Sequence, residues 1–264
     1  MKKVLLILIA SLVVLSACLN SETNTTINAD GSGKMTAMID FSELMKMMAS
    51  SNKNQGEDFV LDTTINMRTF SDTAKSISAY HKSLIRDMQF KLLMDVRDVE
   101  KLKFHVTIIS PFKTLDDFNA LNELMRDKEF DAIFDKAMEM PDLSGQNKED
   151  DGSSKESDNI FASVFPAFYK CVYSKKSIVC KTDTAKYRET IEGLKKMDMD
   201  INGEMEGKML EAAVFTNTLN LPRNPGKITG DSWKKGKTDR ELVQSGNYLD
   251  LYKNPGKYEY SIQY

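Results

Sequence analysis

Apolar and polar residues alternate along several stretches of the chain, and this two-residue period constrains the fold more than any other feature. The stretch from Phe90 to Val96 alternates in this way, and so does the stretch from Leu102 to Ile108. Because successive side chains of a β-strand point to opposite faces, each stretch predicts a strand with one buried face. The polar sequence DVRDVEK between them predicts a turn that joins the two strands as a hairpin.

The same reasoning predicts further strands and helices. Strands are expected within residues 25–40, with a turn at 30–33, and near 60–68, 213–221, 228–234, 238–243 and 258–264. Helices are expected after Asp40, after Ser71, after Thr114, over 130–138, and around Tyr187, Ile191 and Leu194, and Pro111 is expected to end its strand. The sequence therefore predicts an α+β fold, with a mostly antiparallel, curved sheet built from hairpins and several helices packed against it.

The first residues of the chain have the composition of an export signal. Lys2 and Lys3 precede an uncharged, mostly aliphatic run over residues 4–17. A helix of that length is too short to cross a bilayer, which takes about 20 residues. A positive start followed by a short apolar run and small residues is typical of a secretory signal.

The residues that end this run, Leu15-Ser16-Ala17-Cys18, resemble the lipobox of bacterial lipoproteins. The resemblance implies that residues 1–17 are a signal peptide and that Cys18 becomes the first residue and carries a diacylglyceryl group. Two or three acyl chains, each contributing about 0.8 kcal/mol per buried methylene, would hold the protein on a membrane without a spanning helix. The alternative is a buried helix that happens to contain a cysteine.

This resemblance also predicts the domain boundaries and the cellular location of the protein. Residues 18–23 are expected to be a lipidated polar tether, and residues 24–264 a single domain. In Gram-negative lipoproteins an aspartate after the cysteine resembles an inner-membrane retention signal. Leu19 stands there instead, which favours the outer membrane of a Gram-negative bacterium.

Charge and composition exclude one class of partner and point to one irregular segment. The chain has 36 Lys and Arg against 39 Asp and Glu, with both signs interspersed, so we expect no nucleic-acid partner. Residues 142–159 hold a single aliphatic residue among polar ones, a composition that cannot offset the entropy of ordering and predicts disorder. The segment is a domain linker or an insertion within one domain, and we favour the insertion.

Two further cysteines occupy a predicted hairpin. If Lys175 and Lys176 form its tip, Cys171 faces Cys180 at a non-hydrogen-bonded position, where the Cα atoms are about 4.5 Å apart. A disulfide accepts that separation, and an exported compartment permits oxidation. We favour a structural disulfide between Cys171 and Cys180 over the alternative, which is two small buried thiols.

One acidic segment partly matches a calcium loop. Asp198, Asp200, Asn202 and Gly203 occupy its first, third, fifth and sixth positions. The twelfth position, where a calcium loop has a bidentate Glu, is Met209. The preferred alternative is an acidic turn from a helix to a strand, in which Gly203 supplies a positive φ. We expect no cofactor.

The sequence carries no motif of the common enzyme classes: it lacks GxSxG, HExxH, Walker and GxGxxG patterns. The only histidines, His81 and His105, lie in polar surroundings and are expected at the surface. A lipid-tethered hydrolase that uses paired carboxylates remains an alternative, because the fold decides which carboxylates approach. We assign the 16 methionines mainly to core filling, with the lining of an apolar ligand site and copper(I) binding as alternatives.

Three short passages resemble the LppM-type family of bacterial lipoprotein domains. They are the DGSG turn at 30–33, SPFKTLDDFNAL at 110–121, and Asn254-Pro255-Gly256. The resemblance implies an α+β domain of the cell envelope, and it provides no catalytic residues to carry over to this chain. We therefore expect a non-enzymatic lipoprotein, held on the membrane through Cys18, that binds an apolar small molecule or an envelope protein. A purely structural or assembly role, with residues 142–159 as a docking element, is the further alternative.

Overall fold

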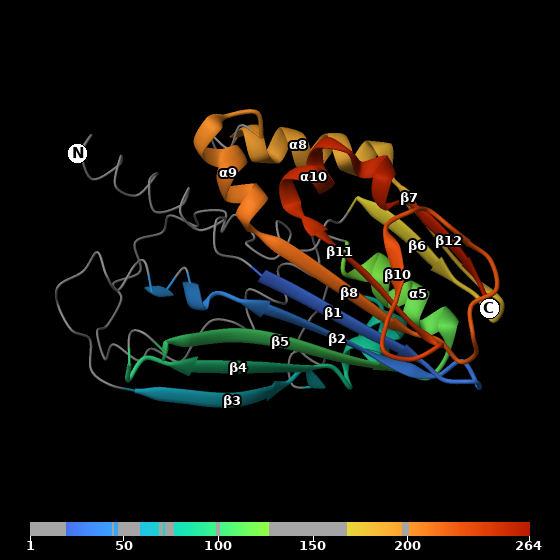
Figure 1. Cartoon of the computed structure of the whole chain (residues 1–264). Coiled ribbons are helices and arrows are strands. Elements are labelled where there is room, and N and C mark those ends of the chain that lie inside the picture. The colour runs from blue at the N-terminus through green and yellow to red at the C-terminus, as the bar shows by residue number, and fades with distance from the viewer. Residues whose placement is uncertain are drawn as a thin grey trace.

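The structure is a computed structural model (Figure 1). It describes residues 20–43, 45–46, 59–68, 71, 77–98, 101–126, 168–196 and 201–264. The proposed signal peptide, Cys18, the helix expected over 130–138 and the polar segment 142–159 therefore lie outside the described residues.

Sheet A is an eight-stranded sheet in the order β10-β11-β8-β1-β2-β5-β4-β3 (Figure 1). Its strands are β1 (Asn20–Ile27), β2 (Gly33–Asp40), β3 (Val60–Asn66), β4 (Gln89–Asp95), β5 (Lys103–Phe112), β8 (Val214–Asn220), β10 (Trp233–Lys235) and β11 (Glu241–Asn247). Neighbouring strands are antiparallel except β1 and β8, which run parallel.

The predicted hairpins form sheet A locally. Strands β1 and β2 are joined through Gly31, whose φ of 88° is a backbone conformation that glycine adopts without steric cost. Asp30 accepts hydrogen bonds from the Ser32 amide at 2.9 Å and from its hydroxyl at 2.7 Å, which fixes the turn. Strands β4 and β5 pair as expected, with Leu92 opposite Val106.

Sheet B has the order β6-β7-β12-β9 and is antiparallel. Its strands are β6 (Tyr169–Tyr173), β7 (Ser177–Thr182), β9 (Ile228–Thr229) and β12 (Tyr260–Gln263). The strand expected over 258–264 is therefore confirmed from Tyr260, and it lies between β7 and β9. Tyr258 is the last residue of a 3-10 helix and not part of this strand.

The helices are α4 (Ala79–Ile85), α5 (Leu115–Leu124), α8 (Thr184–Lys196), α9 (Glu204–Ala212), α10 (Tyr248–Lys253) and the 3-10 helix η2 (Pro255–Tyr258). The predicted cap of α5 is confirmed, since the Thr114 side chain accepts a hydrogen bond from the Asp117 amide at 3.1 Å. Leu115, Phe118 and Leu121 are buried on one side of α5, as their helical spacing predicted.

Helices and sheet B share one face of sheet A (Figure 1). On this face Ile39, Val106 and Phe215 of sheet A form one apolar cluster with residues of α8, α9 and α10. A second cluster joins sheet A to sheet B, with Leu219 and Ile262 among its members. A third cluster packs α4 and α5 against β4 and β5. Because odd and even positions of a strand face opposite ways, the residues between these apolar ones form the more polar face of the sheet.

The predicted α+β class with mostly antiparallel pairing is confirmed, and five finer expectations are corrected. Sheet A is uncurled rather than curved, and the strands divide between two sheets. Residues 20–23, expected in a polar tether, form the first half of β1. The helix expected from Ser71 through Leu84 is interrupted, because Ile77 and Ser78 are not helical and α4 begins at Ala79.

Pro111 does not end its strand, because β5 continues to Phe112. Strand β4 pairs with β5 only as far as Ile109, while β2 continues to pair with Pro111 through Lys34. Beyond Ile109 the strand therefore has a neighbour on one side only. Proline has no amide hydrogen, and it is tolerated where a strand has a free edge.

Candidate functional site

The start of β1 is the part of the described structure nearest in sequence to Cys18. Asn20, the first residue of β1, pairs with Asp40 of β2 on one side and with Val214 of β8 on the other. Two residues of fully extended chain span at most about 7 Å. Only Leu19 separates Cys18 from Asn20 in the sequence, so an anchor on Cys18 would be close to the end of sheet A where β1 begins.

A buried hydrogen bond holds the start of β1 in place. The Ser21 hydroxyl and the Tyr248 hydroxyl are 2.7 Å apart, and both side chains are buried. Burial raises the pKa of the Tyr248 hydroxyl, so this group stays protonated well into the alkaline range. Tyr248 is the first residue of α10, so this contact fastens the N-terminal strand to a helix near the other end of the sequence.

Cys171 and Cys180 form the expected pair. They face each other in the β6–β7 hairpin with the predicted register, and their Cα atoms are 4.0 Å apart. Their sulfur atoms are at the distance of a disulfide, 1.94 Å. Ser174 and Ser177 flank the Lys175-Lys176 tip and hydrogen-bond through their backbones at 2.8 Å. The pair fastens two adjacent strands of sheet B, which is a structural role.

The calcium-loop segment is described only in part. Asp198 and Asp200 lie outside the described residues, and Asn202 lies in the turn that precedes α9. Helix α9 begins at Glu204, directly after Gly203, so the segment leads into a helix and not directly into the strand that we expected. Within the described parts of the chain, no group of three His, Cys, Asp or Glu residues is placed to hold a metal ion.

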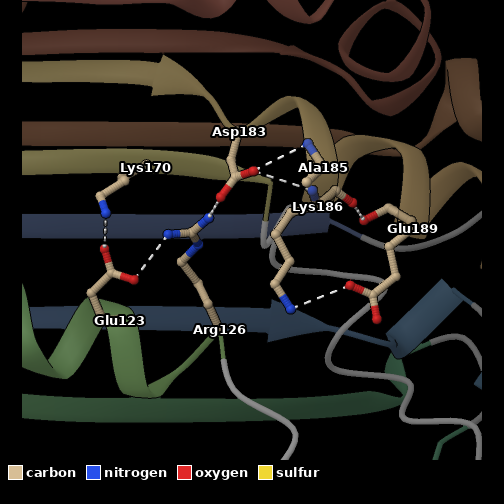
Figure 2. Close-up of polar contacts among 8 residues, drawn as sticks. Glu123, Arg126, Lys170, Asp183, Ala185, Lys186 and Glu189 are labelled. Carbon is tan, nitrogen blue, oxygen red and sulfur yellow. Dashed lines mark hydrogen bonds and ion pairs between the residues drawn. The ribbon is translucent and has the colours of Figure 1, made fainter.

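Arg126 is the centre of a polar cluster that sequence reasoning did not find (Figure 2). Its guanidinium donates to the Glu123 carboxylate at 3.1 Å and to the Asp183 carboxylate at 2.9 Å. Lys170 of β6 lies 3.2 Å from the other oxygen of Glu123. Only 12% of the Arg126 side chain is exposed, against 32% for Asp183. We call these four residues the Arg126 cluster, and it links the end of α5 to strand β6 and to the start of α8.

Asp183 directly precedes helix α8, and its side chain meets the first turn of that helix, as Figure 2 shows. Its carboxylate accepts hydrogen bonds from the amides of Ala185 and Lys186, each at 3.2 Å. The Lys186 amide, followed by the Arg126 guanidinium, holds the pKa of Asp183 below its usual value. The carboxylate is therefore charged at neutral pH. Aspartate before a helical pattern is a local signal that was available in the sequence, whereas its contact with Arg126 was not.

A second polar cluster surrounds Asp250 of α10. Its carboxylate accepts hydrogen bonds from the Tyr258 hydroxyl at 2.7 Å and from the Asn254 amide at 2.9 Å, and forms an ion pair with Lys257. The Lys257 ammonium and then the Tyr258 hydroxyl lower the pKa of Asp250 to about 2. The cluster closes α10 onto η2. Its charge is satisfied within the protein, which suits a structural role better than proton transfer.

The two histidines lie on separate elements. His105 of β5 is opposite Asp40 of β2, with 3.4 Å between its Nε2 and the carboxylate, so it takes part in a strand-to-strand contact. His81 lies in the first turn of α4, where its backbone amide donates to the capping Ser78 hydroxyl at 3.1 Å. Neither arrangement joins a histidine to a serine or cysteine nucleophile.

Three of the described methionines support the core-filling interpretation. Met35, Met67 and Met88 are buried and belong to apolar clusters. Met47 and Met48 of the Met-rich stretch, as well as Met197 and Met199, lie outside the described residues. In the part of the chain that is described, no helix has the length and apolar composition needed to cross a membrane.

Comparison of the chain with family models, with curated proteins and with solved structures finds no match in any of the three. Its function must therefore be argued from its own residues.

Proposed function

We propose that the chain is a non-enzymatic lipoprotein of the cell envelope, anchored to a membrane by acyl chains on Cys18. The observation that carries the proposal is the Leu15-Ser16-Ala17-Cys18 stretch after a short apolar run. The start of β1 at Asn20 supports it, because an amino-terminal strand fixed in the middle of a sheet suits an anchor at its entrance. The proposed location is the outer membrane of a Gram-negative bacterium.

The role that we propose for the folded part is to bind an envelope protein or an apolar small molecule. Met35, Met67 and Met88 fill apolar clusters, and this packing gives the protein-partner version more support than the ligand version. The Arg126 and Asp250 clusters are engaged in ion pairs, and no specific observation among the described residues favours the carboxylate hydrolase. We therefore do not propose it.

Metabolic labelling tests the anchor. Cells that express the full chain are given radiolabelled palmitate, and the protein is followed through membrane fractionation. We expect label in the unaltered protein and none in Cys18→Ser, which should also leave the membrane fraction. A variant with both Cys171→Ser and Cys180→Ser is the matched control, because it loses two thiols and should keep the label. Unchanged labelling of Cys18→Ser would overturn the proposal.

Native mass spectrometry separates the two versions of the binding role. The Cys18→Ser protein carries no acyl chains of its own, so any added mass comes from a bound molecule. The protein-partner version predicts a bare mass, whereas a reproducible apolar adduct would favour the ligand version.

A further inference from the structure

Exposed apolar side chains gather at one end of sheet A. Among the described residues, six large apolar side chains are exposed, and three of them lie where strands of sheet A begin. These three are Phe59 and Val60, at the start of β3, and Val214, at the start of β8, with exposed fractions of 38%, 46% and 44%. We call these three residues the apolar end of sheet A.

The strand pairing places the apolar end at the entrance of β1. Strands β3, β8 and β1 all start at the same end of the sheet. Strand β8 is parallel to β1, and four successive antiparallel pairings lead from β1 through β2, β5 and β4 to β3, so that β3 also runs parallel to β1. Val214 is directly opposite Asn20. The apolar end of sheet A is therefore the end at which β1 begins.

The strand register shows how far β3 extends toward this end of sheet A relative to β1. Asn20 is in one row with Asp40 and His105, whereas Val60 is in one row with Asp95 and Lys103. Lys103 precedes His105 by two residues, so the row of Val60 lies two residues beyond the row of Asn20. Val60 therefore lies farther toward this end of the sheet than Asn20 does.

The width of the sheet makes this end a broad contact. Strand β8 and strand β3 are five strand positions apart, which is about 24 Å at the usual spacing between neighbouring strands. Val214 lies on one side of the β1 entrance, and Phe59 and Val60 lie on the other. Contact on both sides of the anchor would orient the sheet, whereas contact at the anchor alone would leave it free to rotate.

Among the described residues, two ion pairs lie near this end. Arg97 and Asp95 are 2.7 Å apart, and Lys101 and Asp98 are 3.2 Å apart. Both pairs lie close to β3 and to the start of β5. These two pairs are each neutral and add no net positive charge that would attract anionic lipids. The contact that Phe59, Val60 and Val214 offer is apolar.

We infer that the apolar end of sheet A lies in the headgroup layer of the membrane, with Phe59, Val60 and Val214 inserted among the lipids. The inference rests on the proposed function, since the anchor on Cys18 brings this end to the bilayer. Apolar residues at an interface typically enter about 5–10 Å into the boundary between headgroups and acyl chains. The attachment therefore has a defined orientation, with the strands of sheet A pointing away from the membrane.

Tryptophan quenching by lipids tests this orientation in the full lipidated chain. Vesicles are made of phosphatidylcholine with brominated acyl chains, with and without phosphatidylglycerol. The unaltered protein has one tryptophan, Trp233, and two variants, Phe59→Trp and Val172→Trp, each add a second. Val172 is the matched control, because it is 49% exposed but lies in the β6–β7 hairpin of sheet B.

The expected result is that the emission added by Phe59→Trp is quenched several-fold more than the emission added by Val172→Trp. The quenching should be the same with and without phosphatidylglycerol. If the protein floats with the vesicles but the Phe59→Trp emission is not quenched, or Val172→Trp is quenched more, the orientation is wrong and the anchor stands. If the protein does not float at all, the proposed function fails as well.

Discussion

The hydroxyls of Ser21 and Tyr248 share a buried hydrogen bond of 2.7 Å. Ser21 is the second residue of the first strand of sheet A, and Tyr248 is the first residue of α10. A force applied through an anchor at Cys18 would act on the folded domain at the start of β1. The bond is therefore a side-chain contact near the start of β1 that would resist separation of this strand from the sheet.

Removal of one partner of this hydrogen bond should lower the free energy of unfolding. Tyr248→Phe leaves the Ser21 hydroxyl buried without its partner, so we expect a loss of about 1–3 kcal/mol in the free energy of unfolding. Urea denaturation of the Cys18→Ser protein measures it. Tyr80→Phe is the control, because the Tyr80 hydroxyl meets Asp117 at an exposed position and its loss should cost less than about 0.5 kcal/mol. Equal stability of the Tyr248→Phe and unaltered proteins would contradict this account.

The Arg126 cluster predicts a second difference between matched variants. Arg126→Met removes charge-assisted hydrogen bonds to Glu123 and Asp183 from a largely buried position, and we expect a loss of about 2 kcal/mol. Lys186→Met removes an exposed ion pair with Glu189 at 3.3 Å and should cost at most about 0.5 kcal/mol. Chemical denaturation compares the two. A similar cost for both variants would show that the Arg126 cluster contributes no more than a surface pair.

The Cys171–Cys180 pair should be oxidised in the exported protein. Alkylation of the denatured protein should find no free thiol from this pair before reduction and two after it. Because the pair closes a short loop, replacement of both cysteines by serine should lower the free energy of unfolding by about 2–3 kcal/mol. Two reactive thiols in protein taken from the envelope would contradict the predicted disulfide.

Asp250 predicts an acid-dependent loss of stability. Its pKa is lowered from the usual 3.8 to about 2 in the folded protein, mainly by Lys257. A depressed pKa means that the stabilising charge is fully present above pH 3.8 and is lost as the pH falls toward 2. Stability measured across this range should fall less steeply in Asp250→Asn than in the unaltered protein. Carboxyl NMR titration gives the pKa directly, and a value near 3.8 for Asp250 would contradict the prediction.

Local patterns in the sequence were enough to predict much of the fold. Alternation at Phe90–Val96 and Leu102–Ile108 marked β4 and β5, because a strand's period of two is visible within a few residues. The register of Cys171 with Cys180 followed from the position of the turn alone. These features depend only on neighbours in the sequence.

Long-range pairing could not be predicted in this way. The parallel pairing of Asn20 with Val214, and the division of the strands into two sheets, depend on which distant strands meet. The same holds for the Arg126 cluster and for the contact of Ser21 with Tyr248, whose partners are 57 and 227 residues apart in sequence. The short resemblance to a lipobox predicted an anchor but not that β1 begins two residues after it.

Mass spectrometry of the amino-terminal peptide of the protein purified from envelope membranes tests the central claim most directly. The account predicts a peptide that begins at Cys18, with a diacylglyceryl group on its sulfur. An unmodified Cys18, or a mature chain that begins at any other residue, would contradict the proposed anchor.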